Sequence, residues 1–230
     1  MFLRTSIIVI SILVLAACGE RQPNGSGGVT SESKPTFSSI QKAAEQGDTE
    51  AQFNLGVLYE KGRSVSQDYA EARKWYLRAA ENGHASSQYN LGNLYGNGRG
   101  VSQNHVEARK WYLRAAEKGH ASSQYNLGVL YGNGWGVSPD YAEARKWYLR
   151  AAENGHASSQ YNLGLLYYKG QGGRVDYKLA YAWFHAAAEQ GNENAKKIRP
   201  VAGAELDPAS LAEARKLAEQ YHKSYVESFK

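Results

Sequence analysis

A repeat of 36 residues constrains this 230-residue chain more than any other feature. One tryptophan and two glycines mark each unit, and they recur as Trp75, Trp111, Trp147 and Trp183, as Gly56, Gly92, Gly128 and Gly164, and as Gly62, Gly98, Gly134 and Gly170. Residues 79–114 and 115–150 differ at only seven positions. Such a period is typical of proteins in which each unit packs only against its neighbours.

Each unit has the pattern of two helices. In the second unit, apolar residues from Ala85 to Tyr95 share one helical face, and Gly98 suits the end of that helix because glycine tolerates a positive φ. Asn104 lies three residues before Glu107, which is the spacing of a capping box at the start of a second helix. One such pair cannot bury its apolar face alone. The sequence therefore predicts an all-α, right-handed solenoid of 36-residue helix pairs.

The ends of the solenoid have the pattern of capping helices, one at 38–46 and one at 207–225. We expect the last helix to begin after Asp207, with Pro208 at its first position. The predicted organisation is a signal peptide at 1–17, a lipidated cysteine and tether at 18–36, and the solenoid at 37–230. The expected repeat units are about 48–83, 84–119, 120–155 and 156–191, followed by a partial repeat and cap at 192–230.

The first residues have the pattern of an export signal. A short basic start at 1–4 precedes an apolar run at 7–17, which is shorter than the roughly 20 residues that span a bilayer. The following Leu15-Ala16-Ala17-Cys18 resembles the bacterial lipobox, in which the cysteine is acylated. Residues 19–36 are rich in glycine, proline and serine, so we expect a flexible tether. By resemblance to enterobacterial lipoproteins, Gly19 in place of Asp favours the outer membrane, with the protein facing the periplasm.

The repeat pattern resembles a known family. Tyr-Asn-Leu-Gly-x-Leu-Tyr, then Gly-x-Gly-Val, then Glu-Ala-Arg-Lys-Trp-Tyr-x-x-Ala-Ala-Glu-x-Gly-His resembles the Sel-one-like repeats, which are related to the tetratricopeptide repeat. The resemblance covers roughly 43–199. Residues 171–174, Gln-Gly-Gly-Arg, depart from it because the Gly-Val of the loop is lost. The resemblance implies a helical scaffold that binds other proteins.

No constellation of residues indicates catalysis or a cofactor. The histidines at 84, 120 and 156 recur once per unit at a helix start, which is typical of a structural or solvated position. Ser39-x-x-Lys42 matches the nucleophile motif of β-lactamases, but the companion motifs are absent. Cysteine-rich members of the resembled family have been named β-lactamases, whereas Cys18 is the only cysteine here. A hydrolase is therefore a remote alternative, and we expect neither an enzyme nor a bound metal.

Basic residues form like-charge pairs on the second helices, at Lys74 and Arg78 and at the corresponding positions of the next two units. Nearby glutamates leave two interpretations open. The residues form an ordinary solvated face, or they form a surface for an anionic lipid or polymer. Nucleic acid is not expected as a partner of an exported lipoprotein.

By resemblance to tetratricopeptide folds, the first helices line the concave face, and their side chains outside the core stripe form a candidate groove. The candidate partner-binding residues are Phe53, Tyr89, Asn93, Tyr125, Val129, Tyr161 and Leu165, together with Trp135 and Tyr168, which break the repeat. Aromatic rings are enriched at binding hot spots. The alternative is that the rings belong to the core between repeats. Asn54, Asn90, Asn126 and Asn162 are identical in every unit and are interpreted as scaffold.

These observations favour a non-catalytic scaffold, anchored to the bacterial envelope by N-terminal acyl chains, that binds a peptide or another envelope protein in its concave groove. The alternative from a different class is a protein that binds a cell-wall polymer by stacking Tyr and Trp rings on sugars, or that assists in remodelling the envelope.

Overall fold

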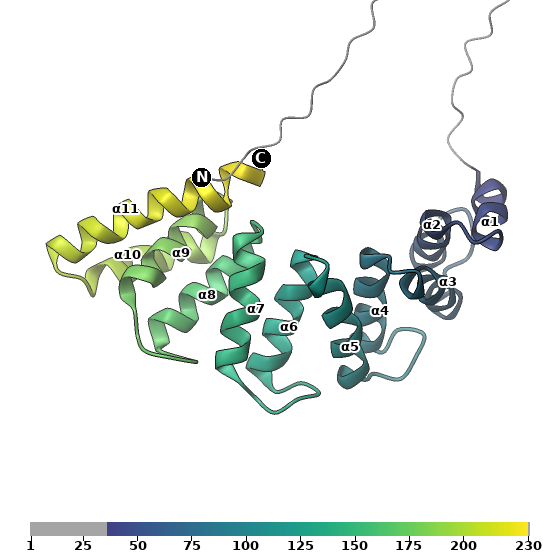
Figure 1. The fold of residues 1–230 in the computed structure, drawn as a ribbon, viewed down its shortest axis with the longest axis horizontal. Helices are drawn as coiled ribbons and strands as arrows, with labels where there is room; N and C mark the ends of the chain where they lie inside the picture. Colours follow the sequence, from purple (N-terminus) through teal and green to yellow (C-terminus); the bar gives the residue numbers. More distant parts are fainter. Residues whose placement is uncertain (1–35, 230) are drawn as a thin grey trace, which may run out of the picture. The chain divides into compact units, whose positions relative to one another are not determined.

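The computed structural model describes residues 36–229, and every regular element in that range is helical (Figure 1). The helices are α1 (Phe37–Glu45), α2 (Thr49–Lys61), α3 (Tyr69–Glu81), α4 (Ala85–Asn97), α5 (His105–Glu117), α6 (Ala121–Asn133), α7 (Tyr141–Glu153), α8 (Ala157–Lys169), α9 (Tyr177–Glu189), α10 (Glu193–Ala204) and α11 (Pro208–Tyr225), with a short 3₁₀ turn at Glu227–Phe229. Helices α2 to α9 form four pairs of consecutive helices that pack against each other, and each pair packs on the next.

Local chemistry sets the helix boundaries. Each first helix from α2 to α8 ends in a left-handed glycine, such as Gly98 with φ 68°, whose N–H donates to the carbonyl of Leu94. Each second helix from α3 to α9 begins after an aspartate or asparagine, such as Asn104, whose side chain accepts the Glu107 N–H at 3.0 Å. The repeat spacing thus places the same stop and start at the same point of every unit.

The predicted capping box forms only in part. The Glu107 carboxylate does not return to the Asn104 N–H but pairs with Lys110 at 2.9 Å. The reason is that the Asn104 N–H already donates to the carbonyl of Tyr95 at 2.8 Å, which ties the loop to the preceding helix. The side-chain half of the box is present and the reciprocal half is replaced.

Glycines in the first helices admit an aromatic ring from the second helix of the same unit. A Cβ placed on Gly92 would fall on the ring of Tyr112, and one on Gly128 would lie 2.5 Å from the ring of Tyr148. The tryptophan of each second helix is buried, and Trp111 shares one cluster with Leu91 and Leu94 of its own unit and with Ala72, Tyr76 and Ala80 of the preceding unit. Each unit thus fills the core of its neighbour, which is why the row is stable only as a stack.

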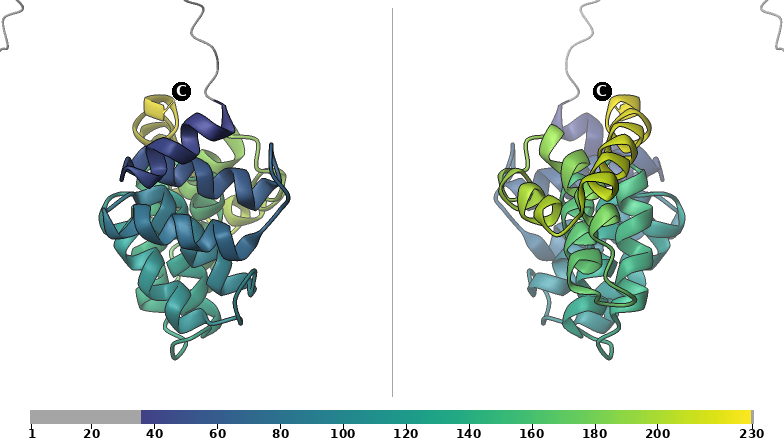
Figure 2. Two further views of the ribbon diagram at one scale, coloured as in Figure 1. Left: turned by 90° about the vertical axis from the view of Figure 1, so that its right-hand side faces the viewer. Right: turned by 90° about the vertical axis from the view of Figure 1, so that its left-hand side faces the viewer.

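The two ends of the stack are closed differently, as the end views show (Figure 2). At one end α1 packs on α2. At the other end both α10 and α11 pack on α9, and the ring of Trp183 lies 4.4 Å from that of Tyr221 and 5.4 Å from that of Tyr225. In α11 the two fully buried residues are Ala214 and Ala218, while its larger inward side chains are half-buried.

The structure confirms the predicted all-α solenoid of 36-residue helix pairs. The predicted capping helices are also present, with α1 one residue earlier at each end than predicted. The predicted signal peptide, Cys18 and all but the last residue of the predicted tether lie outside the described residues. Among residues 36–229, no helix combines the length and apolar character that a membrane span requires.

Candidate functional site

Two neighbouring hollows lie between consecutive first helices. The Trp135 hollow, of about 260 Å³, lies between α4, α5 and α6. It is lined by Tyr89, Asn93, Gly96, Asn97, His105, Tyr112, Asn126, Val129, Leu130 and Trp135. The second helix supplies one wall, the two first helices supply the others, and the glycine loop closes one end.

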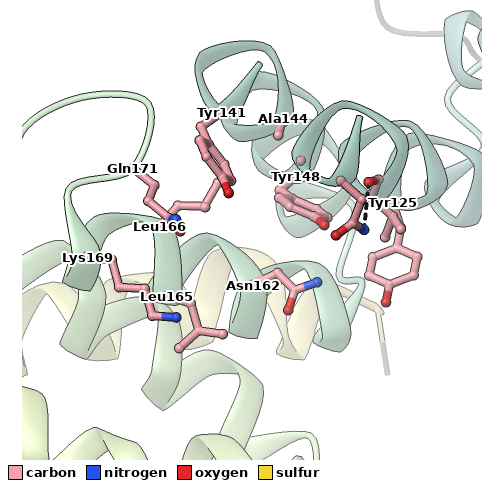
Figure 3. Close-up of a pocket in the computed structure, with 12 residues that line it drawn as sticks. Tyr125, Tyr141, Ala144, Tyr148, Asn162, Leu165, Leu166, Lys169 and Gln171 are labelled. Atoms are coloured by element: carbon pink, nitrogen blue, oxygen red, sulfur yellow. Dashed lines mark hydrogen bonds between the residues drawn. The ribbon is translucent and has the colours of Figure 1, made fainter. Parts of the chain in front are cut away.

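The Gln171 hollow, of about 430 Å³, repeats this arrangement one unit further along (Figure 3). It is lined by Tyr125, Val129, Gly132, Asn133, Tyr141, Ala144, Tyr148, Asn162, Leu165, Leu166, Lys169 and Gln171. Val129 belongs to both hollows, so the two are continuous at that side chain. The structure thus has two adjoining hollows that are built from the same helices of successive units and differ in their lining residues.

Trp135, the loop residue that closes the Trp135 hollow, lies over His105, the first residue of α5. Trp135 stacks on the ring of His105, with centroids 5.5 Å apart and planes at 18°. At the corresponding place one unit earlier, the guanidinium of Arg99 lies 5.8 Å from the centre of the Tyr69 ring. Trp135 remains 48% exposed in this position, so one face of the indole is available to a partner.

A tyrosine hydroxyl lies in the wall of each hollow. The Tyr112 hydroxyl donates to Asn93 Oδ1 at 2.8 Å, and Asn126 Nδ2 donates to the same oxygen at 3.4 Å. Val129 replaces Asn93 in the next unit and offers no acceptor to Tyr148. Burial raises the pKa of Tyr112 and Tyr148 well above the ordinary value, so both hydroxyls stay protonated near neutral pH.

The structure gathers six of the nine candidate partner-binding residues into the two hollows, namely Tyr89, Asn93, Tyr125, Val129, Trp135 and Leu165. It leaves Phe53, Tyr161 and Tyr168 outside them. Phe53 and Tyr161 are half-buried beside Tyr76 and Phe184, at 6.0 and 5.9 Å, and Tyr168 packs edge-on against Tyr177.

The aromatic ladder combines the two roles that the sequence left as alternatives. Tyr89 and Tyr125 pack against the core rings Tyr112 and Tyr148, at 6.1 and 5.9 Å, and each is only half-buried. The same two rings line the hollows. They therefore contribute to the core between repeats with one face and to the candidate site with the other.

Several lining residues were not among the sequence candidates. Tyr112 and Tyr148 recur as core residues, and Asn126 and Asn162 were interpreted as scaffold because they are identical in every unit. Lys169 is the one charged side chain of the Gln171 hollow. The two preceding units carry Asn97 and Asn133 at this position, whereas the first unit carries Lys61, so the position is not constant along the repeat as the asparagines are.

The basic residues of the second helices are largely engaged within their own helices. Lys74 pairs with Glu71 at 3.0 Å, and the same pair recurs in α5 and α7 at 2.9 and 2.8 Å. The guanidinium of Arg78 lies 4.5 Å from the centre of the Trp75 ring, and this too recurs in α5 and α7. These contacts favour the interpretation of an ordinary solvated face.

The histidines at 84, 120 and 156 each stand at the start of a first helix. Within residues 36–229, no group of three histidine, aspartate, glutamate or cysteine side chains is arranged to hold a metal ion. Instead His84, His120 and His156 cap α4, α6 and α8 through their side chains.

Comparison with known proteins identifies the repeat. The model of the Sel1 repeat matches residues 40–48, 49–84, 85–120, 121–156 and 157–192. The chain belongs to the Sel1 repeat family. Sel1 repeat proteins are generally non-catalytic scaffolds that bind other proteins, and the fold described above fits that role. No match to a curated protein was found.

Two solved structures are similar to this Sel1 repeat chain. One is c5321, described as a protective antigen present in uropathogenic Escherichia coli strains and displaying an SLR fold, with 36% identity and a TM-score of 0.76 over 84% of this chain and 42% of that one. The other is a Sel1 repeat protein from Oxalobacter formigenes, with 33% identity and a TM-score of 0.68 over 84% of this chain and 80% of that one. The chain thus spans less than half the length of the Escherichia coli protein.

Proposed function

We propose that this Sel1 repeat chain is a non-catalytic scaffold that binds a segment of another envelope protein across its two hollows. The observation that carries the proposal is where the near-identical units differ. Three of the seven differing positions supply lining residues: Asn93 and Val129, His105 and Tyr141, and Trp135. Residues that serve only the packing between units can be the same in every unit, whereas contacts with an asymmetric partner differ from one unit to the next.

The chemistry of the lining supports a protein segment as the occupant. Tyrosine and tryptophan rings supply contact area with few rotatable bonds, and such residues dominate protein-binding hot spots. Asn126, Asn133 and Asn162 place amide groups along the same face, where they can bond to a peptide backbone. No carboxylate lines either hollow, and Lys169 lines one, so the site favours a neutral or acidic segment.

Val129→Arg tests the proposal because this side chain borders both hollows. The variant should lose capture of the native partner from envelope extracts. Val57→Arg is the matched control, since it introduces the same side chain at the same helix position two units earlier, where neither hollow lies. Both variants are first compared by thermal melting. Equal capture by both folded variants would contradict binding at the hollows, and sedimentation with isolated cell wall alone would favour the polymer-binding alternative.

We further propose that the protein is a lipoprotein of the outer membrane that faces the periplasm. The support is the sequence Leu15-Ala16-Ala17-Cys18 after a basic and then apolar start. N-terminal acyl chains give stable membrane attachment when two or more are present. Cys18→Ser should therefore move the protein to the soluble fraction. A variant that stays with the membranes after a high-salt wash argues against acylation as the anchor.

A further inference from the structure

Every first helix begins at the same repeat position, but the capping side chain changes along the chain. Asp48 caps α2 and Asn192 caps α10, whereas His84, His120 and His156 cap the three helices between them. Aspartate and asparagine are usual N-caps. A histidine can do the same only while its acceptor nitrogen carries no proton.

The bonds to this nitrogen are the same in each case. Nδ1 of His120 lies 3.2 Å from the backbone nitrogen of Ser123 and 3.1 Å from its hydroxyl oxygen. Nδ1 of His156 lies 3.2 and 3.0 Å from the same atoms of Ser159. Both serines are fully buried. Each backbone N–H is shared between Nδ1 and the backbone carbonyl of the same histidine, at 3.0 Å for His120 and 2.9 Å for His156, so the ring is the side-chain acceptor of the pair.

These two rings also cover the aromatic ladder. The ring of His120 lies 4.8 Å from that of Tyr89, and the ring of His156 lies 4.8 Å from that of Tyr125. Each histidine therefore contacts the start of its own helix and a ring of the preceding unit. Protonation of the histidine affects both of these contacts.

The charged surroundings separate His84 from the other two. Nε2 of His84 lies 3.4 Å from Glu50 of α2, and Lys118, which follows α5, donates to the carbonyl of Gly83, the residue before His84. Glu50 can compensate a positive charge on this ring. The positions of Glu50 are taken by Ser86 opposite His120 and Ser122 opposite His156.

Within residues 36–229, no carboxylate forms an ion pair with His120 or His156. Burial lowers the pKa of His120, and burial together with the charge of His120 lowers that of His156. Folding therefore favours the neutral rings. Their contribution to stability is present above the ordinary histidine pKa, near 6.5, and is lost as the pH falls below it.

We propose that His120 and His156 form a pH-sensitive device: protonation of Nδ1 removes the caps of α6 and α8 and loosens the junctions between the second, third and fourth repeats. At neutral pH Nδ1 accepts the serine N–H and Nε2 carries the ring proton. On acidification Nδ1 gains a proton and can no longer accept the serine N–H, and it can then only donate, with the serine hydroxyl oxygen as the acceptor within reach. The uncapped helix start and the Tyr89 and Tyr125 rings are then held less firmly.

The double variant His120→Asn/His156→Asn tests the device, because asparagine is the cap that the chain itself uses at Asn192. The whole chain, purified in a mild detergent, is melted at pH 7.5 and at pH 5.0. On acidification the wild type should lose more in Tm than the variant, by about 2–4 °C for each cap. An equal loss in the two proteins overturns the proposal.

Nuclear magnetic resonance of the wild-type histidines decides the matter even where the double variant folds poorly. At pH 7.5 the ring nitrogens of His120 and His156 should show Nδ1 without a proton, and both rings should titrate below 6.5. Titration at or above that value contradicts the device. If the hollows bind a partner as proposed above, affinity should fall over the same pH range, but melting and titration test the device without any partner.

Discussion

The close contacts between helices and the two hollows differ in whether their residues recur along the repeat. The contacts are built from residues that recur every 36 positions, such as Gly92 with Tyr112 and Gly128 with Tyr148. The hollows are closed by residues that do not recur, of which Trp135 is the largest. In a repeat protein, residues that recur in every unit therefore indicate the packing between helices. Residues that interrupt the repeat indicate a unit with a specific function.

The largest expected effect is a difference in the free energy of unfolding between alanine variants of two tryptophans that lie twelve positions apart. Trp147 is 6% exposed and packs against Ala108, Leu127 and Leu130, so Trp147→Ala should lower the free energy of unfolding by about 3–5 kcal/mol. Trp135→Ala should leave it nearly unchanged because that ring is half exposed. Urea unfolding followed by circular dichroism measures both. Equal losses would remove the distinction between the contacts and the hollows.

A smaller effect is expected at the glycines of α4. A Cβ at position 92 would fall on the Tyr112 ring, so Gly92→Ala should lower the free energy of unfolding by about 1–3 kcal/mol. Gly96→Ala is the matched control, since its Cβ would meet Ala108 at an ordinary 3.6 Å. That variant should be neutral or stabilising, because alanine is favoured over glycine by about 1 kcal/mol inside a helix.

A thermal melt of the two glycine variants beside the wild type is sufficient. If both alanines are tolerated equally, the approach of α4 and α5 is not limited by the ring. If both alanines destabilise the protein, α4 and α5 are too close for a Cβ at Gly96 as well as at Gly92. Gly96 would then not differ from Gly92 as the hollow predicts.

The fold followed from the sequence because its determinants are local and repeated. Gly98 ends a helix through its own φ, and Asn104 starts one through a bond three residues away. The capping box failed in part for a reason that no local pattern contains. The Asn104 N–H is bonded to Tyr95, nine positions earlier, across a loop.

The candidate site was predictable only where it breaks the repeat. Trp135 and Asn93 were found because their counterparts differ. Asn126 was set aside because it recurs, yet it lines a hollow and donates to Asn93. Asn126 has a particular environment because Asn93, its neighbour in α4, is replaced in the next unit. The contact between α4 and α6 forms only in the folded stack, so the sequence pattern does not show it.

Partner binding should respond to Trp135→Ala next. An aromatic hot spot contributes about 2 kcal/mol, which corresponds to a loss of roughly thirtyfold in affinity. Trp135→Arg is the informative companion, since Arg99 occupies this place one unit earlier. Titration against the captured partner measures the affinity of each. Wild-type affinity in a normally folded Trp135→Ala variant would show that the exposed indole face is not a contact.

The smallest effect tests whether the two hollows differ in their walls as well as in their loops. Tyr112 donates to Asn93 at 2.8 Å, so Tyr112→Phe removes a hydrogen bond and should cost about 0.5–1.5 kcal/mol in unfolding free energy. Tyr148→Phe should cost less, because Val129 stands where Asn93 stands. The fourth unit already carries phenylalanine there, as Phe184.

The difference between these two costs is the quantity of interest, and a double-mutant cycle isolates it. Asn93→Val gives the second unit the residue of the third, and Tyr112→Phe in that background should then cost no more than Tyr148→Phe does in the wild type. Agreement would mean that the Tyr112–Asn93 bond accounts for the difference between the two walls. If Tyr112→Phe remains more costly in the Asn93→Val background, another acceptor holds the Tyr112 hydroxyl. The wall of the Trp135 hollow is then fixed by more than the one substitution that separates the two units at this position.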